Sequence, residues 1–201
     1  MTIPTVMEKK DLLLKEVLKK FLQHGIRDVK ISDLTRELNV SSKTLYHHFD
    51  DKKGLIKESF HLYLKNTATE FTSIESTSED VAQILVRFYQ RAISSLSKAN
   101  PAFFRDLSVS YPGIWSSEDA FGLLHARNMI DRGIREEIFV PHLDIHLCSH
   151  TLTNLLRMLL ERKPFTVNTP EMQFNHVIWP YVRGMCTSHG RSMFRKYRID
   201  P

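Results

Sequence analysis

The chain has few of the features that mark secreted, membrane-embedded or disulfide-rich proteins. Its 201 residues include only two cysteines, which are too few for a disulfide framework. No apolar run reaches the roughly 18 residues that a membrane-spanning helix needs, and the N-terminal segment MTIPTVMEKKD carries no apolar signal core. We therefore expect a cytoplasmic protein with no membrane partner.

Signatures of catalysis are also missing. The seven glycines are scattered, and we find no phosphate-binding loop, nucleophile elbow or paired His-Glu zinc motif. The ten histidines leave an enzyme with an acid-base site as an alternative, but no catalytic grouping favours it. We predict that the chain is not an enzyme and uses no cofactor.

The sequence lacks the signals of β-structure as well. It shows no sustained alternation of apolar and polar residues and no Asn-Gly or Asp-Gly turn. Apolar residues recur instead at intervals of three and four, the period of an α-helix, and prolines stand near the breaks. We predict an all-α fold with helices at about 8–25, 31–38, 42–48, 51–70, 78–97, 101–110, 116–132, 142–163 and 170–189.

The most informative segment runs from Ile31 to Leu55 and has the pattern of short helices joined by a tight turn. The turn is Asn39-Val40-Ser41. Asparagine tolerates a left-handed backbone, and Ser41 or Ser42 can accept a hydrogen bond from a free amide at the next helix start. This arrangement is typical of a helix-turn-helix unit, in which the second helix enters the major groove of DNA.

On the second helix, at 42–48, Leu45 and Phe49 would point inward. Lys43, Tyr46 and His47 then lie on the opposite face. Lysine can contact a guanine edge or a phosphate, and a tyrosine hydroxyl suits a phosphate oxygen. The candidate DNA-binding residues are Lys30, Ser42, Lys43, Thr44, Tyr46, His47 and Lys52.

Two lysines, Lys52 and Lys53, fall in the first turn of the following helix, which Asp50 or Asp51 would cap. Positive charge at this position opposes the helix dipole, so a role other than helix stability is indicated. Beside a phosphate, the lysine charge and the free helix amides would act together. A solvated basic turn is the alternative for the lysines alone, and the preceding residues favour the DNA interpretation.

The sequence Thr-Leu-Tyr-His-His-Phe at 44–49, followed by Asp50-Asp51-Lys52 and Leu55, resembles the recognition-helix signature of the tetracycline-repressor (TetR) family of transcription regulators. The resemblance covers roughly residues 8 to 65. A Val182-Arg183-Gly184-Met185 stretch near the C-terminus is also similar. It implies a helix-turn-helix DNA-binding domain over 1–65.

Three positions depart from the family pattern: Lys30 replaces a threonine, Thr35 a small alanine and Asn39 the turn glycine. None of these changes prevents the fold, and Lys30 can supply a longer-range phosphate contact. The net charge of +5 fits a polyanionic partner, although it is spread over both halves of the chain. The prediction of DNA binding therefore depends on the arrangement of side chains on the second helix and not on the net charge.

The resemblance further implies a helical ligand-binding and dimerisation domain over 66–201, whose last two helices form a four-helix bundle with a second copy. A palindromic site needs two recognition helices roughly 34–36 Å apart. The broad apolar arcs of these helices can serve an internal core and a partner together, and a monomeric core is the alternative. The candidate interface residues are Leu152, Leu155, Leu159, Ile178, Tyr181 and Met185.

Aromatic and methionine residues between the two ends suit a flat, hydrophobic or aromatic small molecule as the effector. Ordinary core packing is the alternative for any one of them. Arg105, His125 and Arg157 are possible anchors for an acidic ligand. The candidate ligand-binding residues are Phe88, Phe103, Phe104, Tyr111, Trp115, His125 and Met129.

Two Cys-His pairs contain the sulfur and nitrogen ligands that zinc accepts. Cys148 and His150 diverge by about 200° around a helix and cannot readily share a site, whereas Cys186 and His189 could. Buried thiols and half-exposed imidazoles are the more common situation, so we predict no metal site.

Together these features predict a homodimeric, ligand-responsive repressor that binds a pseudo-palindromic operator on double-stranded DNA. We expect the ligand to favour a state in which the helix at 51–70 swings and moves the recognition helices. The alternative is a DNA-binding regulator whose helical domain binds protein partners and no small ligand. An apolar void with a polar anchor would favour the ligand sensor.

Overall fold

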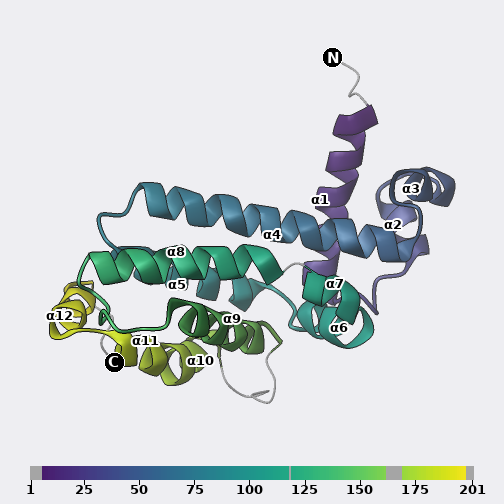
Figure 1. The fold of residues 1–201 in the computed structure, drawn as a ribbon. Coiled ribbons are helices and arrows are strands. Elements are labelled where there is room, and N and C mark those ends of the chain that lie inside the picture. The colour runs from purple at the N-terminus through teal and green to yellow at the C-terminus, as the bar shows by residue number, and fades with distance from the viewer. Residues whose placement is uncertain (1–5, 118, 162–168, 198–201) are drawn as a thin grey trace. The chain divides into compact units, whose positions relative to one another are not determined.

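The computed structural model describes residues 6–117, 119–161 and 169–197 (Figure 1). These residues form helices and no named strand, so the predicted all-α fold is confirmed. None of the helices in these ranges is both long and apolar enough to cross a membrane. In chain order the helices are α1 (Val6–His24), α2 (Ile31–Glu37), α3 (Ser42–Phe49), α4 (Lys52–Ser76), α5 (Val81–Lys98), α6 (Ala102–Ser110), α7 (Pro112–Ser117), α8 (Asp119–Arg135), α9 (Ile145–Glu161), α10 (Pro170–Gln173), the π-helix η1 (Phe174–Ile178), α11 (Trp179–Met185) and α12 (Ser188–Lys196).

The chain divides into two compact units. Unit 1 comprises residues 1–68 and 99–118, and unit 2 comprises residues 69–98 and 119–201. Helix α4 therefore begins in unit 1 and ends in unit 2. Helices α6 and α7 belong to unit 1, although they lie within the 66–201 segment that the sequence assigns to ligand binding and dimerisation.

Unit 1 is built around α1, whose apolar residues share one face. Val17 and Phe21 of this helix are completely buried. Leu34 of α2 and Leu45 of α3 are buried in the same unit, as are Leu55 and Ile56 of α4. Spacings of three and four residues place these side chains on inward faces, so burial of apolar area holds the short helices that could not form alone.

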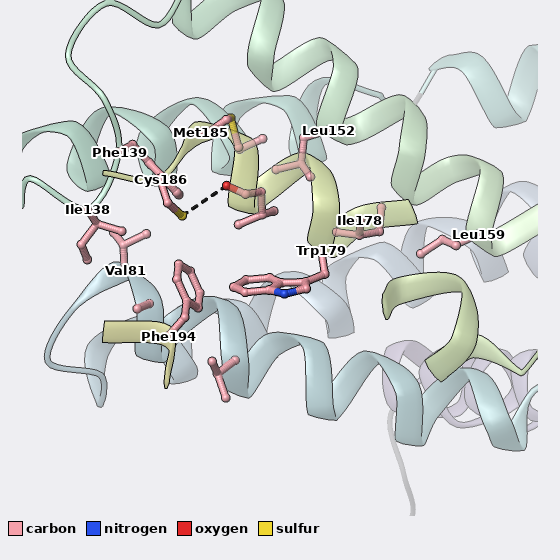
Figure 2. Close-up of a cluster of buried hydrophobic side chains, with 14 residues drawn as sticks. Val81, Ile138, Phe139, Leu152, Leu159, Ile178, Trp179, Met185, Cys186 and Phe194 are labelled. Atoms are coloured by element: carbon pink, nitrogen blue, oxygen red, sulfur yellow. Dashed lines mark hydrogen bonds between the residues drawn. The ribbon is translucent and has the colours of Figure 1, made fainter. Parts of the chain in front are cut away.

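The core of unit 2 gathers buried side chains from α5, α8, α9, α11 and α12 (Figure 2). The rings of Trp179 and Phe194 pack edge to face at 4.7 Å and so join α11 to α12. The segment 138–140 pairs with 185–187 through two backbone hydrogen bonds, Val140 N–H to Met185 O at 2.9 Å and Thr187 N–H to Ile138 O at 3.0 Å. This short pairing fixes the turn after α8 against the end of α11.

The prediction that the helix from residue 51 ends near residue 70 is wrong, because α4 continues to Ser76. Hydroxyl groups explain its stable end: Thr77 donates to the carbonyl of Ser73 at 2.9 Å, and Ser78 donates to the carbonyl of Ile74 at 2.7 Å. Residue 78 does not start the next helix. Helix α5 begins at Val81, and Asp80 caps it by accepting from the amide of Gln83 at 2.8 Å.

The single helix predicted at 170–189 is also wrong. The chain forms α10, a π-helix over Phe174–Ile178, and α11, then leaves the helical conformation at Cys186 before α12 begins at Ser188. Pro180 has no amide hydrogen to donate to the preceding turn, which explains why the regular pattern changes just before it. Thr187 then caps α12 by accepting from the amide of Gly190 at 2.9 Å.

Candidate nucleic-acid interface

The turn between α2 and α3 is set by a residue with positive φ and a side-chain cap. Asn39 adopts φ of +51°, the left-handed conformation that asparagine tolerates. Ser41, not Ser42, caps α3, because its hydroxyl accepts from the amide of Thr44 at 3.0 Å. The same hydroxyl lies 2.8 Å from the hydroxyl of Thr44, so the first turn of α3 is held at two points.

Helix α3 has the two faces that the sequence predicts. Leu45 is completely buried and Phe49 is 2% exposed, and they anchor the helix in unit 1. On the other side Lys43 and His47 are exposed, and Tyr46 is half-buried. The helix therefore presents a basic and aromatic surface to solvent on a firmly held backbone, which is what a groove-binding helix requires.

The remaining candidate DNA contacts surround this face. Ser42 is exposed in the first turn of α3, and Thr44 is half-buried beside its cap. Lys30 is exposed at the start of α2 and makes no side-chain cap. Partial burial, and next the nearby charge of His47, lower the pKa of His48, so the neutral form of this half-buried imidazole is favoured.

Lys52 has a hydrogen-bond partner that the sequence pattern does not predict. Its ammonium group donates to the carbonyl of Val29 at 2.9 Å and so ties the start of α4 to the segment entering α2. One ammonium has three N–H donors, so this contact leaves two for other acceptors. The lysine thus holds the backbone beside the candidate interface.

The connection from α3 to α4 is equally constrained. Asp51, not Asp50, caps α4, because its carboxylate accepts from the amide of Gly54 at 2.6 Å. A Cβ on Gly54 would collide with the carbonyl oxygen of Phe49, so only glycine permits this close approach of the two helices. Helix α3 is therefore fixed at its start by Ser41 and at its end by the packing around Gly54.

Helix α2 is joined to α1 by an ion pair between Lys20 and Glu37. The hydrogen bond from Lys20 is the main reason that the pKa of Glu37 lies below its ordinary value. Both this pair and the Lys52 contact depend on residues distant in sequence. A sequence pattern alone gives no signal for them, except that each lysine is a long flexible donor.

The candidate ligand-binding residues fall into two groups, one in each unit. In unit 1, Phe104 is 1% exposed and its ring lies 5.3 Å from Tyr63 and 6.4 Å from Trp115. Phe103 is completely buried and packs at 5.1 Å against Phe104. Tyr111 ends α6 and is half-buried. Phe103, Phe104, Tyr63 and Trp115 form an aromatic cluster within unit 1, which Phe60 joins through Tyr63 and Trp115.

The second group lies in unit 2. Phe71 packs against Phe88 at 5.2 Å and against the ring of His125 at 4.5 Å. Met129 is half-buried and packs against the core of unit 2. Burial lowers the pKa of His125, and the charge of Glu75 opposes this effect. His125 is therefore neutral over a wider pH range than a free imidazole.

The candidate dimer residues are directed largely into their own chain. Leu152, Leu159, Ile178 and Met185 belong to the buried core of unit 2 (Figure 2). Leu155 and Tyr181 are half-buried against this core. The outward surface of the same helices is formed by other residues. Leu147 on α9 is 64% exposed, and Met172, Pro180 and Gly184 are also exposed.

The cysteines have no metal partners in the part of the chain that the structure describes, where no group of three or more His, Cys, Asp or Glu side chains could hold an ion. Cys186 is buried, and its thiol lies 3.2 Å from the carbonyl of Val182, to which it donates. Burial raises the pKa of Cys186 to about 11, so the thiol stays protonated. Cys148 is half-buried.

Comparison with known proteins agrees with this geometry. Residues 13–59, which include all of α2 and α3, match the model of the bacterial regulatory proteins of the tetR family. Among curated proteins none matches the chain.

Solved structures extend the likeness to the whole fold. A TetR-family transcriptional regulator from Pectobacterium atrosepticum is 18% identical, with 90% of this chain and 96% of that chain covered and a TM-score of 0.72. A TetR-family regulator from Agrobacterium tumefaciens is 12% identical over 90% and 99%, also with a TM-score of 0.72. The ketosteroid transcriptional regulator of Mycobacterium tuberculosis is 18% identical over 92% and 98%, with a TM-score of 0.59. Residues 13–59 therefore carry the DNA-binding domain of the bacterial regulatory proteins of the tetR family, and the chain as a whole has the fold of solved TetR-family regulators.

Proposed function

We propose that the chain is a homodimeric repressor that binds a pseudo-palindromic operator through α3 and releases it when a small hydrophobic or aromatic effector binds. The observation that carries the DNA part is the two-faced α3. Its inward Leu45 and Phe49 fix the helix, while Lys43 and His47 stand exposed beside Tyr46. The DNA-binding function then lies within 1–65, and ligand binding and dimerisation within 66–201.

Dimerisation is required by the symmetry of the site, because each half-site takes one recognition helix. We place the contact on α9 and on the α10 to α11 segment, as the sequence suggests. Since four of the six predicted residues already fill the intrachain core, their exposed neighbours Leu147, Met172 and Pro180 are the better candidates for the outer contact. A single chain would leave these apolar groups in water.

The effector response is a population shift. A ligand seated against the aromatic residues lowers DNA affinity only by as much as it prefers the state that does not bind DNA, commonly about 1–3 kcal/mol. Helix α4 carries Phe60 and Tyr63 of the aromatic cluster, and Lys52 at its start touches the segment before α2. A displacement of α4 is therefore one route from ligand to DNA.

The experiment begins with selection of DNA sites from a random library by the purified full chain. Fluorescence anisotropy with excess nonspecific competitor then measures affinity, salt dependence and stoichiometry on the selected site. Competitor-resistant binding of two protomers to an inverted repeat supports the proposal, and addition of aromatic compounds tests release. Binding that competitor removes completely contradicts sequence-specific recognition and leaves a protein-binding regulator as the better hypothesis.

A further inference from the structure

Asp106 on α6 is the one charged side chain that is buried within the described residues, with only 3% of its surface exposed. A buried carboxylate is costly unless charged or hydrogen-bonding partners compensate for the lost water. The partners of the Asp106 carboxylate therefore indicate its structural role. They lie about 80 residues away in sequence, in the connection between α1 and α2.

One carboxylate oxygen of Asp106 accepts two backbone hydrogen bonds, from the amide of Ile26 at 3.0 Å and from the amide of Arg27 at 2.9 Å. Hydrogen bonds to a charged acceptor are stronger than neutral ones. The other oxygen lies 3.5 Å from the guanidinium of Arg27. We call residues 25–30 the α1–α2 corner. Two of its amides, those of Ile26 and Arg27, are thus held by a side chain of α6.

Further contacts join α6 and the residues before it to the corner and to the end of α1. The amide of Asn100 donates to the carbonyl of Leu22 at 2.6 Å, and Arg27 donates to the hydroxyl of Ser110 at 2.8 Å. Gly25 has φ of +84°, and a Cβ there would lie only 2.7 Å from the Cβ of Ala102. The corner is therefore held along the whole length of α6.

The residues of α6 divide between two partners. Ala102, Asp106 and Ser110, spaced by four, lie on the face that meets the corner. Phe103 and Phe104 meet the ring of Tyr63 on α4, at 6.1 and 5.3 Å. A nine-residue helix moves as one body, so a shift of the aromatic face also shifts Asp106.

We infer that Asp106 is a positioning residue that transmits displacement of α6 to the DNA-reading helices through the α1–α2 corner. This inference rests on the proposed effector-responsive function and adds a second route beside α4. When α6 moves, either the corner follows or the buried carboxylate loses its amide partners, which is unfavourable. The corner leads directly into α2, and Val29 within it is held by Lys52.

A double-mutant cycle with DNA affinity as the readout tests this role without knowledge of the effector. Phe104→Leu disturbs α6 from its aromatic side, and Asp106→Asn removes the charge while it keeps one acceptor oxygen. We expect Phe104→Leu to change the dissociation constant on the selected DNA site. That change should differ by at least about fivefold when Asn replaces Asp106, because the two substitutions act on one coupled element.

The matched control is a second cycle that combines Phe104→Leu with Arg105→Ala. Arg105 is an exposed neighbour of Asp106 on the same helix. This control should be additive with Phe104→Leu. Additive effects for Asp106→Asn, with wild-type DNA binding intact, would overturn the positioning role and leave only a structural one. If the wild-type chain selects no DNA site, the proposed function fails and this inference fails with it.

A second measurement uses the wild-type chain alone, in case Asp106→Asn does not fold. Amide hydrogen exchange at Ile26 and Arg27 should slow by about fivefold or more when the selected DNA is bound, since the two sites are coupled reciprocally. Exchange at these amides that DNA leaves unchanged, while α3 becomes protected, would contradict the inference.

Discussion

The ammonium of Lys52 and the backbone carbonyl of Val29 are joined by a hydrogen bond of 2.9 Å that spans 23 residues of sequence. The first turn of α4 is thereby attached to the segment that enters α2. The sequence predicts Lys52 only as a phosphate contact, but this lysine also supports the helix-turn-helix unit. The two roles are separable by experiment.

Lys52→Ala should reduce stability by about 1 kcal/mol, because the Val29 carbonyl loses its donor. It should also weaken DNA binding on all sequences and lower the slope of log affinity against log salt by about one unit, since one phosphate contact is lost. Urea denaturation and anisotropy at several salt concentrations measure the two effects. The control is Lys57→Ala, which removes an exposed lysine farther along α4. An unchanged salt slope together with lost stability would assign Lys52 a structural role alone.

The outward face of α3 makes a distinct prediction. Lys43→Ala should change the preferred DNA sequence, because Lys43 is exposed where it can reach a base edge. Tyr46→Phe should weaken binding on every sequence, as loss of a phosphate contact does. Repeating the selection from a random library with each variant gives the measurement. Lys19→Ala on α1 is the control, and an unaltered site for Lys43→Ala would make Lys43 a phosphate contact.

Gly54→Ala tests the close approach of α3 and α4. The added Cβ meets the Phe49 carbonyl oxygen, so one of the two helices must shift, and we expect a loss of stability of about 1–3 kcal/mol with weaker DNA binding. Gly113→Ala is the matched control, because a Cβ there has no neighbour within 4 Å. It should be neutral or slightly stabilising. Equal unfolding free energies for the two variants would argue against the constraint.

Stability should fall as the solution is made acidic, in part through His125. Burial lowers its pKa below the ordinary 6.5, so the unfolded chain binds this proton more readily than the folded chain. The contribution of neutral His125 to the free energy of unfolding is complete above pH 6.5. It is lost as the pH falls from 6.5 to the lowered pKa of His125 in the folded chain. Urea denaturation between pH 7.5 and 5 should show a smaller loss for His125→Phe than for the wild type.

The control for this pH effect is His189→Phe, which replaces an exposed histidine of α12. It separates the loss of the His125 imidazole from the general effect of replacing histidine with phenylalanine. A His125→Phe variant with the full wild-type loss between pH 7.5 and 5 would mean that other groups are responsible.

Local sequence patterns were sufficient to predict the fold class and the position of the recognition helix. The spacing of Leu45 and Phe49 determines which face of α3 is buried, and helix chemistry limits the cap of α3 to Ser41 or Ser42. The structure shows that Ser41 is the cap. The end of α4 was placed too early, because the hydroxyl groups after Phe71 can end a helix as well as start one. The segment at 170–189 was predicted as one helix, because the sequence does not show that the regular helical pattern changes before Pro180. The burial of Asp106 has one signal in the sequence, which is an acidic residue on an apolar helix face. Its amide partners could not be predicted, because they are brought close only by the tertiary fold.

The two constraints on α3, the Ser41 cap at its start and the glycine approach at its end, have a consequence for how such regulators diversify. Because the backbone of α3 is held by residues that face inward or flank it, the outward side chains can be exchanged without repacking the unit. Changes in the outward side chains then leave the core of unit 1 intact. For the same reason, a set of outward residues grafted from a solved TetR-family regulator is expected to bring the DNA preference of that regulator with it.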